Sequence, residues 1–439
     1  MFGTSGIRGG VGESVTAALA LAVGRAVASE GYETVVIGRD PRESGIVLQD
    51  ALTAGLRECG TDVIDAGCVA TPTVARAVGT LEADAGVVIT ASHNPAPDNG
   101  IKLWLPSGKA FGPSERAAIE GRLEREAYDL AGWDGHGTIT PLADAADRHA
   151  EAIRESVAIE TPLEVVVDLG NGAGRVTADV LRDLGCAVTT LNGQPDGSFP
   201  GRPSEPDDHT LGTLKATVAR TDADLGIAHD GDADRMVAVD ETGTFVPKDV
   251  LLALFARESA TEGTRVAAPV DTSLTVDDAL SAVGASVTKT RVGDVYVAEK
   301  ATEPDVVFGG EPSGAWIWPE ETLCPDGPLA AAKLVELVAD AGPLSALVAA
   351  VDTYPLERDS LEVADKSAVM AAVEDVARER YDESDVDTLD GIRVDRDAGW
   401  FLIRASGTQP LIRVTAEART ASGLEDVHEE AMGLLEDCL

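Results

Sequence analysis

Basic and aromatic residues are both scarce in this chain of 439 residues. Lys and Arg number 35 against 76 Asp and Glu, which gives a formal net charge of −41, and aromatic residues make up only 4%. This charge argues against binding nucleic acid or an anionic membrane through a general positive field, because both would be repelled. The acidic residues are spread along the chain rather than gathered in a tail. We therefore expect a protein adapted to high salt, in which screening weakens the self-repulsion.

Cysteine is also sparse, and its spacing predicts neither a disulfide framework nor a zinc site. The five cysteines are Cys59, Cys68, Cys186, Cys324 and Cys438. This pattern is typical of reduced thiols in a cytoplasmic protein. No apolar run approaches the roughly 20 residues that a membrane span needs, and the chain opens on a Gly-rich segment instead of a signal peptide. We expect a soluble, cytoplasmic protein without a membrane partner.

At 439 residues the chain is too long for a single core, and its 44% hydrophobic residues are enough to fill several cores. Helical periodicity predicts helices at 14–30, 46–58, after Pro72, 114–126, 144–157, 209–221, 249–259, 366–380 and 421–436. Short apolar runs predict strands at 34–38, 62–65, 86–89, 163–168, 187–191, 225–228, 236–239, 265–268, 306–308, 360–363, 391–394, 400–403 and 411–416.

Helices and strands alternate up to about residue 351, which predicts α/β domains with largely parallel sheets covered on both faces. From about residue 352, neighbouring strands with helices outside them predict an α+β domain. We expect four domains, at residues 1–140, 141–243, 244–351 and 352–439.

Residues 90–95 (TASHNP) follow the predicted strand 86–89. Ser92 therefore stands at the carboxyl end of a strand, where open α/β sheets bind ligands. A turn at residues 98–100 is expected to bring Lys102 onto the same short loop as Ser92 and His93. From these residues alone, a reactive loop and an ordinary polar turn are equally good interpretations.

Three carboxylates alternate after the strand 225–228: Asp230, Asp232 and Asp234. On an extended loop such residues point the same way, so their oxygens converge as hard ligands. An EF-hand loop begins similarly, but the Gly and bidentate Glu that it needs further along are missing. A solvated acidic turn is the alternative. We favour a metal site, because like charges this close repel unless a cation lies between them.

Three further motifs occur along the chain, at residues 2–9 (FGTSGIRG), 310–314 (GEPSG) and 404–410 (RASGTQP). With the TASHNP and DGDADR stretches, they cover the whole chain and resemble the motifs of the α-D-phosphohexomutases. The resemblance implies three similar α/β domains with mixed sheets, a C-terminal α+β domain, and an active site in a central cleft.

The resemblance also implies a reaction, in which a phosphoserine at Ser92 exchanges phosphate with a hexose phosphate through a sugar bisphosphate. One Mg²⁺ per chain would be held by the phosphate on Ser92 and by Asp230, Asp232 and Asp234, and Mg²⁺ suits such an all-oxygen set.

Resemblance assigns the proton transfer at the sugar hydroxyl to Lys102, and places Arg8 and Arg235 near the transferring phosphate. A lysine can accept a proton only if neighbouring cations or burial lower its pKa. The alternative for Lys102 is a solvated surface lysine, and for the two arginines it is pairing with the abundant carboxylates.

The remaining motif residues are expected to bind substrate. Glu311 and Ser313 would hold sugar hydroxyls, because a carboxylate can accept hydrogen bonds from two adjacent OH groups. The non-reacting phosphate would be bound by the carboxy-terminal motif, where Arg supplies a bidentate fork and a Gly-containing turn supplies backbone N–H groups. Its residues are Arg404, Ser406, Gly407, Thr408 and Arg413.

The choice of sugar depends on few residues. Ser313 and the opening motif favour the branch of the family that interconverts glucosamine 6-phosphate and glucosamine 1-phosphate, in an archaeal, salt-adapted form. Ala315 stands where that branch commonly has His, so mannose, glucose and pentose phosphates stay open. Outside the family, a metal-dependent phosphohydrolase would use the same serine and aspartates. An acidic ion-binding protein would need only the Asp triplet. Monomer and homodimer both stay open.

Overall fold

The computed structural model describes residue 3 and residues 6–406 and 411–439. The chain divides into two compact units. The first unit combines residues 1–251 with residues 313–348, and the second combines residues 252–312 with residues 349–439. The domain boundaries predicted at 140, 243 and 351 stay a prediction.

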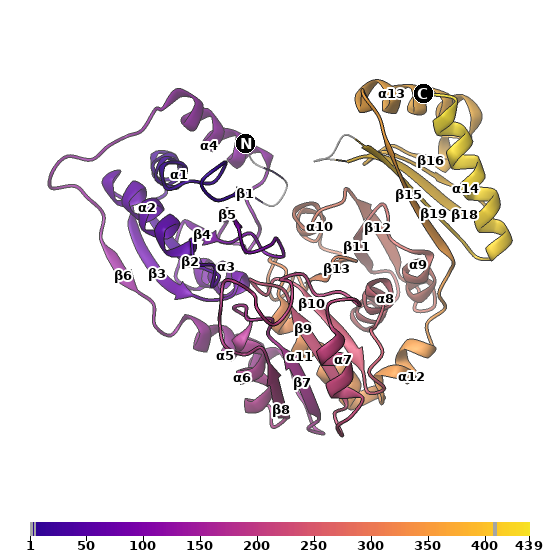
Figure 1. The fold of residues 1–439 in the computed structure, drawn as a ribbon, viewed down its shortest axis with the longest axis horizontal. Helices are drawn as coiled ribbons and strands as arrows, with labels where there is room; N and C mark the ends of the chain where they lie inside the picture. Colours follow the sequence, from indigo (N-terminus) through magenta and orange to yellow (C-terminus); the bar gives the residue numbers. More distant parts are fainter. Residues whose placement is uncertain (1–2, 4–5, 407–410) are drawn as a thin grey trace. The chain divides into compact units, whose positions relative to one another are not determined.

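The first sheet of unit 1 has six strands in the order β1-β5-β4-β2-β3-β6 (Figure 1). Their bounds are Ile7–Gly10 (β1), Thr34–Arg39 (β2), Asp62–Cys68 (β3), Ala85–Ile89 (β4), Asp98–Trp104 (β5) and Ile139–Pro141 (β6). β2, β3, β4 and β6 run parallel, whereas β5 pairs antiparallel with both β4 and β1. The sheet is therefore mixed.

Helices cover both faces of this sheet (Figure 1). They are α1 (Ala17–Ser29), α2 (Gly45–Glu58), α3 (Thr71–Thr80), α4 (Pro113–Arg125) and α5 (Ala145–Ser156). Val35 and Ile37 pack into a core with α1 and α2, whereas Val36 packs into a separate core with α3. Successive strand side chains point to opposite faces, so the unbroken apolar run of β2 reflects burial on both sides.

The second sheet of unit 1 has the order β10-β9-β7-β8. Its strands are Glu164–Asp168 (β7), Ala187–Leu191 (β8), Leu225–His229 (β9) and Met236–Asp240 (β10), and the helices α6 (Arg175–Asp183) and α7 (Gly212–Val218) lie between them in sequence. The chain later contributes β14 (Ala315–Ile317), α11 (Gly327–Ala341) and α12 (Leu344–Ala349). The indole of Trp316 donates to the carbonyl of Met236 at 2.9 Å, which ties β14 to β10.

Unit 2 contains a parallel set, β12-β11-β13, and an antiparallel sheet with the order β15-β19-β18-β17-β16. The parallel part comprises β11 (Arg265–Pro269), α9 (Leu274–Ser281), β12 (Ser286–Thr290), α10 (Asp294–Lys300) and β13 (Val306–Glu311), and α8 (Lys248–Ser259) precedes it. The antiparallel part comprises β15 (Leu356–Glu362), α13 (Lys366–Arg380), β16 (Val386–Asp387), β17 (Ile392–Asp395), β18 (Gly399–Ala405), β19 (Leu411–Ala418) and α14 (Ala421–Glu436). α13 and α14 pack on one face of this second sheet (Figure 1).

The predicted fold class is confirmed: α/β segments with mixed sheets precede an α+β segment at the carboxyl end. Two local predictions were wrong. Residues 98–100 are not a turn but the start of β5, because pairing with β1 holds them extended, whereas β4 pairs with residues 101–104. The predicted helix 209–221 shrinks to α7, Gly212–Val218. In the described part of the chain, no helix is long and apolar enough to cross a membrane.

Two glycines let α1 and α2 approach until their backbones touch. A Cβ atom on Gly24 would lie 2.3 Å from the carbonyl oxygen of Leu52, and one on Gly55 would lie 2.2 Å from the carbonyl oxygen of Leu21. Neither position can hold a side chain unless the helices separate.

We predict that Gly55→Ala lowers the free energy of unfolding by about 1–3 kcal/mol, because the added methyl group overpacks the helix contact. Gly433 in α14 is the matched control, since a Cβ there would meet no atom within 4 Å. Gly433→Ala should stabilise the protein by about 0.5–1 kcal/mol through higher helix propensity. Urea unfolding measures both effects, and a Gly55→Ala protein as stable as the wild type would contradict the contact.

Candidate active site

Ser92 lies directly after β4 in a buried, strained turn. Its side chain is 1% exposed, and its backbone adopts a positive φ of 52°, a conformation that L-residues other than Gly, Asn and Asp rarely take. Residues held in such conformations need surroundings that enforce them, and they gather at functional sites. The turn itself spans residues 91–98, where Asn94 N–H donates to Ala91 O and Asp98 N–H to Pro95 O, each at 3.0 Å.

The three aspartates that follow β9 converge on Ser92. Asp230, Asp232 and Asp234 are all buried, and one carboxylate oxygen from each lies within 4.8 Å of the others. Ser92 Oγ donates to Asp230 Oδ2 at 2.7 Å and lies 3.5 Å from Asp234 Oδ1. Oδ1 of Asp232 is buried without a hydrogen-bond partner. A buried acceptor without a donor beside two further carboxylates fits a divalent cation with oxygen ligands.

The pKa values of the triplet reflect this crowding. Burial, followed by the charges of Asp234 and Asp232, raises the pKa of Asp230 well above its ordinary value. Burial and the charge of Asp232 likewise raise the pKa of Asp234. Burial alone would raise the pKa of Asp232 as well, but Lys102 beside it holds that pKa below its ordinary value. The triplet therefore carries more negative charge than its surroundings neutralise.

Lys102 is the cation that meets the triplet, and it projects from β5 rather than from a loop. Its Nζ lies 2.8 Å from Asp232 Oδ2 and 2.5 Å from Asp234 Oδ2, and the side chain is buried. Burial alone would lower the pKa of Lys102, but the two carboxylates raise it above its ordinary value. The lowered pKa that proton acceptance requires is therefore not produced by this arrangement.

The charges of two arginines and of Lys102 act on the imidazole of His93. Burial, then the charges of Arg235, Arg8 and Lys102, lowers the pKa of His93 to about 2, so the ring is neutral. Its Nδ1 and the Nε of Arg8 are buried without hydrogen-bond partners. Cations gathered around a neutral ring, with unused donors among them, favour an anion such as phosphate at this point.

Small residues from distant segments pack against the metal loop. A Cβ on Gly172 would lie 2.7 Å from Gly231 O, and one on Gly327 would lie 2.6 Å from Ala233 O. Thr71 at the start of α3 donates its hydroxyl to Asp232 Oδ2 at 2.6 Å. Close contacts to the backbone of the metal loop and the hydrogen bond to Asp232 therefore fix the loop from several sides.

Ser313 belongs to the segment that passes beside the metal loop. Met236 N–H donates to Gly314 O at 2.9 Å, and Ala315 forms a bridge with Arg235. Glu311 lies beyond the predicted strand 306–308 but is the last residue of β13 in unit 2.

The carboxy-terminal motif begins at the end of β18, which pairs with β19 in unit 2. Arg404 and Arg413 stand directly opposite each other across the two strands, and Lys366 Nζ donates to the carbonyl of Ser406 at 2.5 Å. Like charges placed opposite each other repel, and an ion pair between Arg404 Nη1 and Asp390 Oδ2 at 3.2 Å relieves part of that repulsion. Gly407 and Thr408 lie outside the described residues.

Sequence reasoning missed several residues that contact the catalytic loops. Arg42 and Ser204 hold the carbonyl of Ser92, and Arg202 donates to the carbonyl of His229 at 2.6 Å. Arg42 lies just after the predicted strand 34–38, and the other two lie in the Pro- and Gly-rich stretch 195–208. Only the three-dimensional contacts distinguish them from ordinary loop residues.

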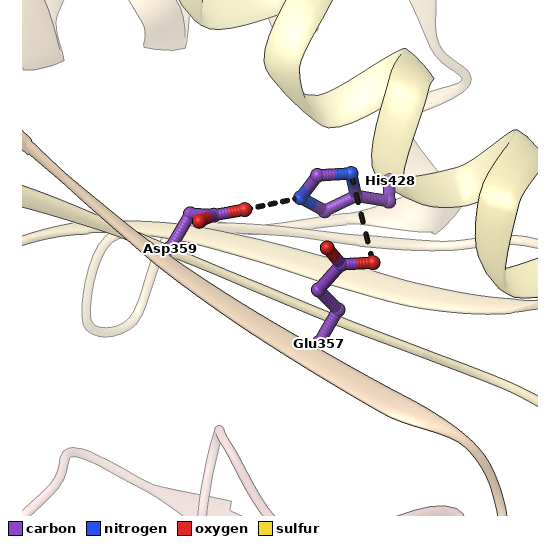
Figure 2. Close-up of side chains that lie close together, drawn as sticks. All are labelled: Glu357, Asp359 and His428. Atoms are coloured by element: carbon purple, nitrogen blue, oxygen red, sulfur yellow. Dashed lines mark hydrogen bonds and ion pairs between the residues drawn. The ribbon is translucent and has the colours of Figure 1, made fainter.

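A separate cluster of side chains lies on unit 2, between β15 and α14 (Figure 2). His428 Nε2 lies 2.7 Å from Asp359 Oδ2, and its Nδ1 lies 4.0 Å from Glu357 Oε2. Both carboxylates are about half exposed. Because the two ring nitrogens face different carboxylates (Figure 2), the cluster is an exposed hydrogen-bonded pairing, of the kind that contributes little to stability.

Known proteins share both the sequence and the fold. Residues 1–129, 147–243 and 247–354 match alpha/beta/alpha domains I, II and III of phosphoglucomutase/phosphomannomutase, and residues 360–434 match its C-terminal domain. The chain belongs to this family. Membership identifies the protein as a phosphohexomutase, confirms the resemblance, and implies a divalent metal and a phosphoserine. The Asp triplet is the group of described residues that offers the metal buried ligands.

Relatives of this phosphohexomutase match it from end to end. A probable phosphoglucosamine mutase of Methanothermobacter thermautotrophicus is 47% identical, with 100% of this chain and 98% of that protein covered. A probable phosphoglucosamine mutase of Methanopyrus kandleri is 46% identical with the same coverage. The crystal structure of a phosphoglucomutase/phosphomannomutase family protein from Burkholderia thailandensis is 29% identical and superposes with a TM-score of 0.89, covering 100% of this chain and 98% of that one.

We predict that Mg²⁺ stabilises this phosphohexomutase more strongly as the pH rises. The folded-state pKa values of Asp230 and Asp234 are raised, so in the metal-free protein their contribution to stability is greatest in acid and is lost as the pH rises through those values. Mg²⁺ binds the ionised carboxylates and offsets that loss. Thermal unfolding with and without saturating MgCl₂ at about pH 5 and about pH 8 measures the effect.

Asp230→Asn is the matched control for this experiment, because it removes one of the repelling charges and keeps the shape of the side chain. The pH dependence of the Mg²⁺ effect should become weaker in this variant. A Mg²⁺ effect that is independent of pH and unchanged in Asp230→Asn would show that the triplet holds no metal.

Proposed function

We propose that the protein interconverts glucosamine 6-phosphate and glucosamine 1-phosphate through a phosphoserine at Ser92. The observation that carries the proposal is the 2.7 Å hydrogen bond from Ser92 Oγ to Asp230, within a buried triplet of carboxylates. Full-length identity of 47% to a probable phosphoglucosamine mutase supports this choice of sugar.

In the first half of the proposed reaction, a sugar hydroxyl attacks the phosphorus of the phosphoserine. The bond between phosphorus and Ser92 Oγ breaks, a bond from phosphorus to the sugar oxygen forms, and the proton of the sugar hydroxyl ends on Ser92 Oγ. In the second half, Ser92 Oγ attacks the other phosphate of the bisphosphate, and the same exchange runs in reverse. Lys102, which lies among the carboxylates that face Ser92, is the proposed relay for the proton, because a Mg²⁺ bound by Asp232 and Asp234 would offset the carboxylate charge that raises the pKa of Lys102 in the metal-free protein.

Charge stabilisation is the main task in phosphoryl transfer. Asp230, Asp232 and Asp234 would hold one Mg²⁺, which when bound neutralises charge on the transferring group. Arg8 and Arg235 would hold the oxygens of that group, as the effect of their charges on the pKa of neighbouring His93 supports.

Sugar and distal phosphate would be bound by the remaining motif residues. Glu311 and Ser313 would accept and donate hydrogen bonds to the sugar. The distal phosphate would be held by Arg404, Ser406, Gly407, Thr408 and Arg413. The opposed arginines of β18 and β19 support this assignment.

We predict that intact-mass analysis of the purified protein reveals a phosphorylated fraction, and that Ser92→Ala abolishes it. Ser107→Ala is the matched control, because Ser107 is exposed and lies outside the catalytic loops; this variant should keep the phosphorylated fraction. Full turnover by Ser92→Ala would refute the covalent mechanism. Net release of phosphate by the wild type would indicate a phosphohydrolase instead.

We also predict a higher kcat/KM for glucosamine 6-phosphate than for mannose or glucose 6-phosphate. A carboxylate at Glu311 can pair with a protonated 2-amino group, which is worth roughly 1–2 kcal/mol or about ten-fold in specificity. Glu311→Gln should reduce the ratio of kcat/KM for glucosamine 6-phosphate to that for the neutral sugar phosphates. Glu320→Gln, at an exposed position, should leave this ratio unchanged. Preference of the wild type for a neutral sugar by about ten-fold would overturn the choice of sugar.

A further inference from the structure

Arg42 lies beside the active site but outside every sequence motif. Arg42 is 0% exposed, and all five of its guanidinium N–H donors are used. Nη2 donates to the carbonyls of Ser92 (2.8 Å) and Asn94 (2.7 Å), and Nη1 donates to those of Pro95 (2.7 Å) and Asp98 (2.8 Å). Four carbonyl groups of the Ser92 turn therefore converge on one planar cation.

The fifth donor starts a path to the other side of Ser92. Arg42 Nε donates to Asp40 Oδ2 at 2.9 Å, and the same oxygen accepts the hydroxyl of Thr90 at 2.7 Å. The hydroxyl oxygen of Thr90 in turn accepts the backbone N–H of Ser92 at 2.8 Å. Both peptide groups that flank the Ser92 Cα are thus fixed by one network, which begins at Arg42.

Residues 197–204, from a distant part of unit 1, cover this network. The Arg42 guanidinium lies 5.0 Å from the ring centroid of Phe199, and a Cβ on Gly197 would lie 2.4 Å from Arg42 Cα. Ser204 adds a second hydrogen bond to the carbonyl of Ser92, at 2.8 Å. Arg42, Asp40, Thr90 and Ser92 are all buried, so the hydrogen bonds that link them compete little with water.

Such a network matters because Ser92 holds an unfavourable backbone conformation, with φ at 52°. A residue in this region returns to a relaxed conformation unless its surroundings prevent it. Relaxation would turn Oγ away from Asp230, and displacement of a reacting atom by about 1 Å can cost about 10²-fold in rate.

We propose that Arg42 is a positioning residue, which through Asp40 and Thr90 holds Ser92 Oγ in the orientation required for phosphoryl transfer. This inference rests on the proposed function of Ser92. Arg42 touches neither the reacting atoms nor the metal ligands in the contacts described, and it acts only through the backbone of the turn.

The test compares two buried arginines of similar surroundings. Arg393 in unit 2 is 2% exposed, donates to Asp395 and to the carbonyl of Val270, and lies 4.1 Å from the ring of Trp400. Lysine keeps the charge of either residue but lacks the planar guanidinium that donates hydrogen bonds to several carbonyl groups at once. Arg42→Lys and Arg393→Lys are therefore expected to lower the melting temperature to a similar extent.

Only Arg42→Lys should impair the chemistry. We expect its kcat to fall by at least about ten-fold, with the KM for sugar phosphate and the Mg²⁺ affinity changed by less than about two-fold. Phosphorylation of the dephosphorylated protein by glucose 1,6-bisphosphate, followed by intact mass, should slow by the same factor as kcat. Arg393→Lys should retain the wild-type values of all four quantities.

Equal kcat values for Arg42→Lys and wild type would overturn the proposal. If Arg42→Lys does not fold, Thr90→Val and Ser204→Ala decide the question, because each removes one link to Ser92 and leaves Arg42 in place. A drop in kcat without a change in KM in these variants supports the proposal, and wild-type kcat in both refutes it. A wild type that interconverts no hexose phosphates and takes up no phosphate on Ser92 would refute the proposed function instead.

Discussion

Electrostatic repulsion among three buried carboxylates is the constraint on which the site depends. Asp230, Asp232 and Asp234 present oxygens within 4.8 Å of one another, and a low-dielectric interior strengthens their repulsion. Lys102 neutralises part of that charge, and the unpaired oxygen of Asp232 leaves room for a further cation. Family membership accounts for this arrangement, since a site prepared for a divalent metal must carry excess negative charge when the metal is absent.

A second conflict arises because a chain with a net charge of −41 must attract anions. The structure resolves it locally. The charges of Arg8, Arg235 and Lys102 act on His93, and Arg404 stands opposite Arg413 on neighbouring strands of unit 2. At physiological ionic strength, exposed charges are screened beyond about 8 Å. On the proposed function, direct contacts with these cations would decide phosphate binding, and the acidic surface would contribute little to it.

Much of the fold was predictable where periodicity is strong. The helices 366–380 and 421–436 coincide with α13 and α14 residue for residue, because long amphipathic segments carry many consistent signals. Short polar segments were less predictable. Residues 98–100 have the composition of a turn, yet pairing with β1 holds them extended, since strand pairing outweighs local propensity.

The sequence by itself determined the family, the fold class, and the placement of Ser92 and the Asp triplet after strands, since these depend on local pattern and on motif order. Only the tertiary structure decided what holds them in place. Arg42 reaches Ser92 across about 50 positions of sequence, and Ser204 reaches it from more than 100 positions away. Such partners leave no local pattern in the sequence. An arginine that will be buried cannot be told from an exposed one by its neighbours in the chain, because its hydrogen-bond acceptors come from distant segments that only the folded structure brings close.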